Sequence, residues 1–503
     1  KENFNVEEEI SSEIGDVWAT LPESIRRTEA PNIPEVPQHR VLRHFLRLSQ
    51  MCMGFDIATD MMGTCTMKYS PKVHDHISRG AKLADLHPLQ AEESLQGLLE
   101  LMFRFNRIMC EISGMDEFTF QPGSGAQGIY TNACLIRAYH ESRGDLKRNE
   151  IITTAFSHPA DAATPAVAGF KVITLMPGEM GFAEVDALKE AISDRTAGLM
   201  LTNPEDTGQY NPHIQEFVNL VHEAGGLCAY DQANGNPLLG VVRAADTGFD
   251  MCQFNLHKTF SAPHGALGMG CAAVGVKEFL RTYLPRPLVF KNAVGEYGLD
   301  YNQGEGIEKI RSFIGNVHAV LKAYSWVMSL GAEGLRAVAE TAVLNNNYML
   351  KKIREIPGVS IPWPENTHPK LEQVRYSFEK MAMDTGVGSH DIINRMVDYG
   401  VQHCMPSHVP MLVPEPFTVE PGESLTVEEM DQMVQVLRDI SEEAYKDPKI
   451  VQDAPYNSST LPIDSDVPED PDCWAFTYRA YQRKKSKWSA EDRRKVERHS
   501  GGY

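Results

Sequence analysis

Between about residue 115 and residue 290, short apolar runs alternate with stretches in which apolar residues recur every three or four positions. The short runs are typical of buried β-strands, and the longer period is typical of amphipathic helices. This alternation predicts an α/β domain with a mostly parallel sheet. Ligands of such sheets bind at the carboxyl ends of the strands, so the residues after each run are the first candidates for function. The strand-like runs are 117–120, 151–155, 171–175, 198–202 and 227–230, and the helical stretches between them include 186–192 and 214–223.

Outside this region the patterns differ and predict three further segments. Apolar residues follow a helical period at 41–48 and at 96–103, and a loop without a clear period lies between them, at 61–69. Two helical stretches follow at about 305–355, and the pattern from 370 to 440 is mixed, which is typical of a smaller α+β domain. The predicted segments are a helical N-terminal segment (1–110), the large α/β domain (111–300), connecting helices with a small C-terminal domain (301–455) and an extended charged tail (456–503).

Composition narrows the class of protein. Hydrophobic residues make up 42% of the chain and charged residues 23%, as in soluble globular proteins. The net charge of −20 argues against a nucleic-acid-binding protein, because phosphate backbones need a basic surface. No stretch is long and apolar enough for a membrane helix, and the acidic N-terminus has no export signal, so we expect a cytoplasmic protein. The nine cysteines are scattered, without a C-x-x-C pair, and predict neither a disulfide framework nor a metal site.

Two candidate segments directly follow strand-like runs. The first is a turn of small residues at 121–128, in which Ser124, Gly125 and Ala126 lead into a helix. Small residues let backbone N–H groups approach an anion, and a helix N-terminus adds a favourable dipole, so this turn is a candidate phosphate site. The second is His158, which is either a structural histidine or a ring that stacks on a planar cofactor.

Two further candidates end the next strands. Asp231, followed by Asn234, ends the run at 227–230 and is costly to ionise there unless it is paired, for example with a cationic ring nitrogen. The alternative is a cap or turn aspartate. Lys258 lies in a largely apolar segment between His257 and Thr259, where burial would lower the pKa of the amine, as imine chemistry requires.

The order of these features carries more information than any one of them. A phosphate turn, a stacking histidine, an aspartate and then a lysine describe a pyridoxal-phosphate site, with an anion anchor, an electron sink and an imine-forming amine. A dinucleotide-binding turn is the competing interpretation, because residues 123–128 spell Gly-Ser-Gly-Ala-Gln-Gly. That interpretation leaves the lysine segment unexplained.

Several longer motifs extend over nearly the whole chain up to about residue 460. They are Gly-Thr-Cys-Thr-Met-Lys-Tyr (63–69), His-Pro-Leu-Gln (87–90), Arg-Ala-Tyr-His-Glu (137–141), Asn-Leu-His-Lys-Thr-Phe (255–260), Pro-His-Gly (263–265) and Leu-Gly-Ala-Glu-Gly-Leu-Arg (330–336). Together they resemble the glycine decarboxylase family, the P-proteins of the glycine cleavage system, and most closely subunit 2 of the two-subunit form.

The resemblance implies a fold and a role for each candidate. The fold would be the aspartate-aminotransferase-like fold type I of pyridoxal-phosphate enzymes. Lys258 would form the internal imine, Asp231 would face the pyridine nitrogen, and His158 would stack on the ring. The remaining implied contacts are Ser124, Gly125 and Ala126 around the phosphate, His257 beside the imine, Thr259 near the phosphate, and Asn234 in the cofactor site.

The resemblance also implies an activity and partners. The chain would decarboxylate glycine and transfer an aminomethyl group to a lipoylated carrier protein, alongside a partner subunit and within a homo- or hetero-oligomer. Departures from the family pattern occur at 129, 160, 161, 232, 266, 267 and 404–406. They leave open a stand-alone decarboxylase, lyase or carbon–carbon bond-forming enzyme acting on another amino acid. A non-catalytic partner with the same fold is the third hypothesis, against which Lys258 counts.

Overall fold

The structure is a computed structural model that divides the chain into two units, residues 1–52 and 53–503. The residues it describes are 8, 12–15, 17–27, 29, 35–54, 56–63, 66, 69–263, 268–302, 304–403, 406–458 and 478–490. The first unit contains two short 3-10 helices, η1 (Val17–Thr20) and η2 (Glu23–Ile25), and the helix α2 (Gln38–Gln50). Helix α2 confirms the helical period predicted at 41–48.

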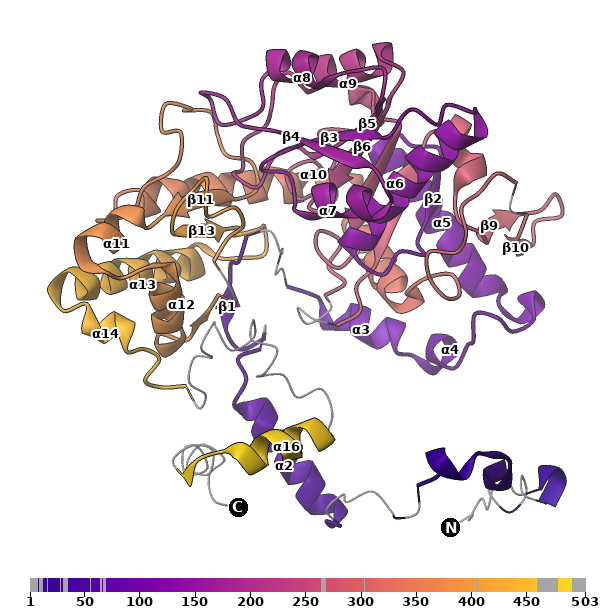
Figure 1. The fold of residues 1–503 in the computed structure, drawn as a ribbon, viewed down its shortest axis with the longest axis horizontal. Coiled ribbons are helices and arrows are strands. Elements are labelled where there is room, and N and C mark those ends of the chain that lie inside the picture. The colour runs from indigo at the N-terminus through magenta and orange to yellow at the C-terminus, as the bar shows by residue number, and fades with distance from the viewer. Residues whose placement is uncertain are drawn as a thin grey trace. The chain divides into compact units, whose positions relative to one another are not determined.

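The second unit is built on a seven-stranded sheet in the order β2-β8-β7-β6-β5-β3-β4 (Figure 1). Strand β8 is antiparallel to its neighbours β2 and β7, and the other pairs are parallel, as the sequence predicts. All five predicted runs are strands, and two more join them. The strands are β2 (Glu117–Thr119), β3 (Glu150–Thr154), β4 (Lys171–Leu175), β5 (Thr196–Thr202), β6 (Leu227–Gln232), β7 (Met251–Asn255) and β8 (Ala272–Val276).

Both faces of this sheet are buried, because successive residues of its inner strands enter different hydrophobic cores. Ile151, Met200 and Ala229 pack into a core with α6 (Gly125–Ser142), whereas Ile152, Leu201 and Tyr230 pack into a core with α5 (Gln96–Ser113) and α9 (Ile214–Glu223). The alternation follows from the two-residue period of a strand. Two more helices connect strands of this sheet: α7 (Ala160–Val167) lies between β3 and β4 in the sequence, and α8 (Val185–Ala191) lies between β4 and β5.

The C-terminal part has its own core. A long helix, α10 (Val317–Ile353), leads into it, and Gly331 interrupts the helical backbone with a φ of 66°. The sequence predicts helix from about 305, but the helix begins only at Val317, because Gly304 and Gly315 adopt positive φ values before it. The elements that follow are β11 (Val374–Ser377), α11 (Glu379–Thr385), α12 (Ser389–Asp398), β12 (Val401–Gln402), β13 (Pro416–Val419), α13 (Val427–Lys446) and α14 (Lys449–Gln452).

Two small sheets belong to this C-terminal core. Strand β11 pairs antiparallel with β13, and β12 pairs in parallel with β1 (Thr59–Asp60) from the start of the second unit. Residues 59–62 are therefore part of the C-terminal core rather than of the sheet domain, and Met61 is fully buried in it.

The residue boundaries predicted for the four segments stay predictions. The remaining elements are α3 (Lys72–Ser78), α4 (Ala81–Ala84), η3 (Glu92–Ser94), η4 (Ala245–Thr247), η5 (Glu278–Tyr283), β9 (Leu288–Lys291) and β10 (Tyr297–Asp300).

The predicted tail differs from the structure in one place. Residues 478–487 form helix α16 (Tyr478–Lys487), which contains the basic run that the sequence analysis assigned to an extended arm. Arginine, lysine, glutamine and alanine favour helix, and this segment contains neither glycine nor proline. The acidic stretch at 463–470 lies outside the described residues.

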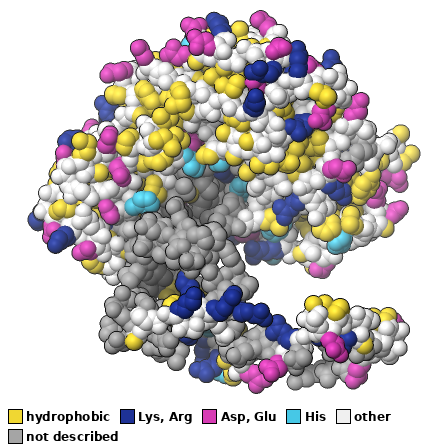
Figure 2. Space-filling model, viewed as in Figure 1, with side chains coloured by type: hydrophobic (Ala, Val, Ile, Leu, Met, Phe, Trp, Pro, Cys, Tyr) yellow, Lys and Arg dark blue, Asp and Glu magenta, His cyan; other side chains and the backbone are white. Residues whose placement is uncertain are grey.

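Surface charge is mixed on the face shown in Figure 2, where acidic and basic side chains are interspersed with hydrophobic ones. Within the described part of the chain, no helix has the length and apolarity that crossing a bilayer requires.

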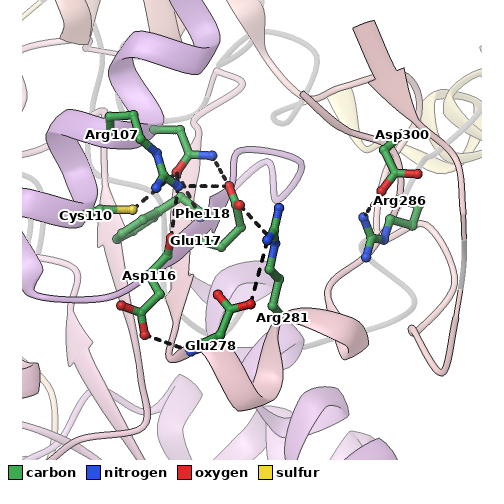
Figure 3. Close-up of polar contacts among 10 residues, drawn as sticks. Arg107, Cys110, Asp116, Glu117, Phe118, Glu278, Arg281, Arg286 and Asp300 are labelled. Atoms are coloured by element: carbon green, nitrogen blue, oxygen red, sulfur yellow. Dashed lines mark hydrogen bonds and ion pairs between the residues drawn. The ribbon is translucent and has the colours of Figure 1, made fainter. Parts of the chain in front are cut away.

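A network of ion pairs holds the edge strand β2 (Figure 3). The Glu117 carboxylate is buried, lies 3.4 Å from Arg107 Nη2 and 3.2 Å from Arg281 Nε, and also accepts a hydrogen bond from Asn106. Asn106 Oδ1 in turn accepts a bond of 3.1 Å from the Phe118 backbone. The network therefore connects α5, β2 and η5 through one carboxylate.

We predict that Glu117→Gln lowers the free energy of unfolding by about 1–2 kcal/mol, because two guanidinium groups lose the buried charge that they share. Urea denaturation measures this change. Glu278→Gln is the matched control, because Glu278 also pairs with Arg281, at 3.7 Å, but its side chain is 70% exposed. The control should change stability by less than about 0.5 kcal/mol. Equal effects of the two substitutions would contradict a special role for Glu117.

Candidate functional site

Lys258 lies in the turn that directly follows β7. Its backbone N–H donates to Asn255 O at 3.1 Å, which folds the chain back at the strand end. The side chains of Lys258 and His257 are both buried, with 8% and 9% of their surface exposed. The lysine of the sequence prediction therefore lies inside the protein at the carboxyl end of a sheet strand, where imine-forming amines are found.

Asp231 lies on the neighbouring strand β6 and is also buried. Its Oδ1 accepts a bond of 2.8 Å from the Ala233 backbone and another from Gln253 Nε2. Its Oδ2 is buried without a hydrogen-bond partner among the described residues. A buried carboxylate oxygen of this kind fits a cationic ring N–H. Sequence reasoning missed Gln253, although it lies in register with Asp231 on β7.

His158 follows β3 and is half-buried. Its Nδ1 accepts a hydrogen bond of 3.1 Å from the Ala160 backbone, so the neutral ring carries its proton on Nε2. Burial lowers the pKa of His158, and the charge of nearby Lys258 lowers it further. Because the charges of Lys258 and Asp231 both act on this ring, the structure brings the three predicted groups together.

Asp161 is a further carboxyl group beside Asp231, and only 1% of it is exposed. It accepts a hydrogen bond of 3.2 Å from Thr202 Oγ1, and Thr202 pairs with Asp231 in the register of β5 and β6. Burial, together with the adjacent Asp231 carboxylate, raises the pKa of Asp161 well above its ordinary value. The raised pKa favours the neutral, protonated form of Asp161.

The predicted phosphate turn forms the N-terminus of α6. Ser124 caps the helix, because its Oγ accepts a bond of 3.1 Å from the Gln127 backbone. A Cβ atom on Gly125 would lie 2.6 Å from Asn255 Nδ2, so the turn closely approaches the end of β7. Ser124 and Ala126 are exposed, and Gly125 is half-buried. The turn therefore presents backbone N–H groups next to the lysine strand.

The other predicted cofactor contacts, Asn234, His257 and Thr259, form hydrogen bonds with the loops around the site. The Thr259 hydroxyl accepts a bond of 2.8 Å from the Gly235 backbone and lies 3.3 Å from Asn234 Oδ1. Asn234 Nδ2 donates to Glu420 at 2.6 Å, and His257 Nδ1 lies 3.1 Å from the Cys271 backbone. Thr259 thus supports the loop after Asp231, and its role near a phosphate stays a prediction.

Charged residues that sequence reasoning missed reach the site from the C-terminal part. Arg375, fully buried on β11, lies 3.5 Å from Asp206 Oδ2, and His408 Nδ1 lies 3.2 Å from the same oxygen. Burial opposes ionisation of Asp206, but His408 and Arg375 outweigh it and lower its pKa to about 2. The His158 and His408 rings meet edge to face, with centroids 5.4 Å apart. No local motif marks these residues, because they lie about 170 or more positions apart.

Two further acids are buried in this region: Glu372, on which the charge of Lys258 acts, and Glu205, next to Asp206. Burial, reinforced by the neighbouring Glu420, raises the pKa of Glu372 well above its ordinary value. Burial raises the pKa of Glu205 to about 8. The site is therefore rich in carboxyl groups, of which several stay neutral. The replacements noted at 266, 267, 404 and 405 lie outside the described residues.

Comparison with known proteins identifies the family. A family model described as glycine dehydrogenase, C-terminal domain, matches residues 338–459. A protein of Pyrococcus horikoshii named "Probable glycine dehydrogenase (decarboxylating) subunit 2" is 43% identical over 452 residues, which cover 90% of this chain and 89% of that protein. A protein of the same name from Caldanaerobacter subterraneus is 40% identical over 445 residues, with 88% and 90% covered.

Solved structures share the fold. A glycine decarboxylase (P-protein) of the glycine cleavage system, in an inhibitor-bound form, superposes with a TM-score of 0.73 at 18% identity, covering 87% of this chain and 99% of that one. A glutamate decarboxylase of Lactobacillus brevis superposes with a TM-score of 0.63 at 14% identity, covering 84% and 97%. These similarities show the fold type I architecture of pyridoxal-phosphate enzymes, as predicted.

The site fits the cofactor of such enzymes. A buried lysine, a buried aspartate with an unpartnered oxygen, a histidine and a helix N-terminus lie around the carboxyl ends of neighbouring strands. These residues fit pyridoxal 5′-phosphate, the cofactor that the sequence predicts. With relatives 40–43% identical over about nine-tenths of its length, the chain belongs to the family of glycine dehydrogenase (decarboxylating) subunit 2.

Proposed function

We propose that the chain decarboxylates glycine, with pyridoxal 5′-phosphate held on Lys258, as one subunit of a larger enzyme. The observation that supports this most strongly is the buried Lys258 beside Asp231 and His158, in a chain 43% identical to a relative named for glycine decarboxylation. Lys258, Asp231 and His158 each have a separate role in this reaction. When bound, pyridoxal phosphate accepts the electron pair released as the bond to the carboxylate breaks.

Lys258 supplies the amine to which the cofactor attaches. Only 8% of its surface is exposed, which limits the access of water to the amine. His257 precedes it, and the Cys271 backbone holds the His257 ring in place. This arrangement fixes the direction of the lysine side chain at the strand end.

Asp231 would hold the cofactor through its ring nitrogen and would favour the protonated form of that nitrogen. Ala233 and Gln253 hold Oδ1, which leaves Oδ2 to accept a hydrogen bond from the ring nitrogen. Protonated Asp161 lies beside this carboxylate and adds no second negative charge. His158, whose Nδ1 already accepts a hydrogen bond from the Ala160 backbone, would lie against the cofactor ring as a neutral imidazole.

The partners follow from the family. The relatives' names include "subunit 2", which supports assembly with a second, different subunit. The resemblance to the glycine cleavage P-proteins supports a lipoylated carrier as the acceptor of the aminomethyl group. No feature of the described residues favours the stand-alone alternative on another amino acid.

The decisive experiment is exchange of labelled bicarbonate into the carboxyl group of glycine, with the partner subunit and the lipoylated carrier present. Wild-type chain should catalyse exchange, and Lys258→Ala should lower the rate by about 1000-fold or more, because no other amine can replace it. Lys171→Ala is the control, because Lys171 is exposed on the edge strand β4. Absence of exchange by wild-type chain that carries its full complement of cofactor would refute the proposal.

A second prediction concerns Asp161. A carboxyl whose pKa is raised on folding binds its proton more tightly in the folded state, so stability is lost as the pH rises above about 4 towards the raised value. Asp161→Asn removes this dependence. The unfolding free energy of wild type should fall relative to Asp161→Asn by about 1.4 kcal/mol per pH unit in that window.

Urea denaturation over a series of pH values measures this difference. Asp186→Asn is the control, because the Asp186 side chain is 92% exposed, and it should show the wild-type slope. Parallel pH profiles of wild type and Asp161→Asn would show that Asp161 is ionised in the folded chain.

A further inference from the structure

Arg311 lies directly against the turn at the N-terminus of α6. A Cβ atom on Gly123 would lie only 1.7 Å from Arg311 Nη1, so this side chain can take its position only because residue 123 is glycine. Gln127 ties the two segments together. Its Oε1 accepts a bond of 2.6 Å from the Gly123 backbone, and its Nε2 donates to Ile310 O at 3.1 Å.

Among the described residues, the guanidinium group of Arg311 has only a weak hydrogen-bond acceptor. Its Nη2 lies 2.9 Å from Met269 Sδ, and a thioether sulfur is a poor acceptor. Among the residues that the structure describes, no carboxylate forms an ion pair with Arg311. A guanidinium offers five N–H donors in a planar fork, which matches two oxygens of an oxyanion.

The surroundings of Arg311 connect it to the lysine turn. Met269 and Gly270 are fixed by Asn316, whose Nδ2 lies 3.2 Å and 3.1 Å from their carbonyl oxygens. A Cβ atom on Gly270 would lie 2.6 Å from His257 Nδ1. The segment that contacts Arg311 therefore also lies against the residue before Lys258.

We propose that Arg311 binds the phosphate group of the cofactor, together with the backbone N–H groups of the turn at 124–126. The inference rests on the proposed use of pyridoxal phosphate at Lys258 and adds a residue that neither the motifs nor the family resemblance indicated. The turn supplies N–H donors and a partial positive charge, and Arg311 supplies a full charge that can pair with two phosphate oxygens. It is a cofactor-binding residue from a segment about 190 positions beyond the turn.

The test compares two ligands that differ only in the phosphate. Cofactor-free full chain is titrated with pyridoxal 5′-phosphate and with pyridoxal, and the visible absorbance of the lysine-bound ligand gives each dissociation constant. For Arg311→Met, the dissociation constant of pyridoxal phosphate should rise by about 10- to 100-fold, whereas that of pyridoxal should stay within about twofold. Arg311→Lys keeps the charge but loses the fork and should give an intermediate value.

Lys309→Met is the matched control, because it removes an exposed cation from the same segment. It should alter neither constant. Equal losses of affinity for both ligands in Arg311→Met would show that Arg311 supports the fold rather than the phosphate, and unchanged constants would show that it contacts neither; either result overturns the inference. A wild-type chain that binds neither ligand would refute the proposed cofactor site as well, so the two failures are distinguishable.

Discussion

Burial of charge at one edge of a parallel sheet is the constraint on which the site depends. The carboxyl ends of β5, β6 and β7 meet there, and hydrophobic cores cover both faces of the sheet, so little water is available to stabilise a carboxylate. The structure resolves this in two ways. His408 and Arg375 outweigh burial and lower the pKa of Asp206, whereas burial, together with the adjacent Asp231 carboxylate, raises the pKa of Asp161. Asp231 Oδ2 has no hydrogen-bond partner among the described residues and can accept a hydrogen bond from a cationic ring.

Local sequence was sufficient for the sheet and for the three central groups. Strand-like runs are short and apolar because both faces of the strands are buried. This pattern can be recognised in the local sequence without knowing which strands pair. His158, Asp231 and Lys258 could be identified because each lies at or just beyond the carboxyl end of a strand, and parallel strands bring these ends to one edge. The three groups are far apart in the sequence, and the parallel arrangement of the strands brings them close together in the structure.

Residues that act through long-range contacts could not be predicted in this way. Gln253 holds Asp231 only because β6 and β7 pair in one register, and Arg375 reaches Asp206 from a separate core. Two segments also differ from what their local sequence predicts. Glycines with positive φ delay the start of α10 to Val317, and a charged composition that suggested an extended arm forms helix at 478–487. Charge runs do not distinguish a solvated helix from a coil, because both expose the same side chains.

Cofactor binding and substrate choice depend on residues from different parts of the chain. The groups around the cofactor site lie on or just after sheet strands that two hydrophobic cores cover. The departure from the family pattern at Asp161 places a buried carboxyl beside Asp231. Glu420 reaches Asn234 from just beyond β13, and Arg375 reaches Asp206 from β11, so contacts from the C-terminal core close the site on its other side. Those contacts depend on how the C-terminal core packs against the sheet domain. A change of substrate therefore requires changes at this junction and in the adjacent loops, whereas the lysine and its aspartate can remain as they are.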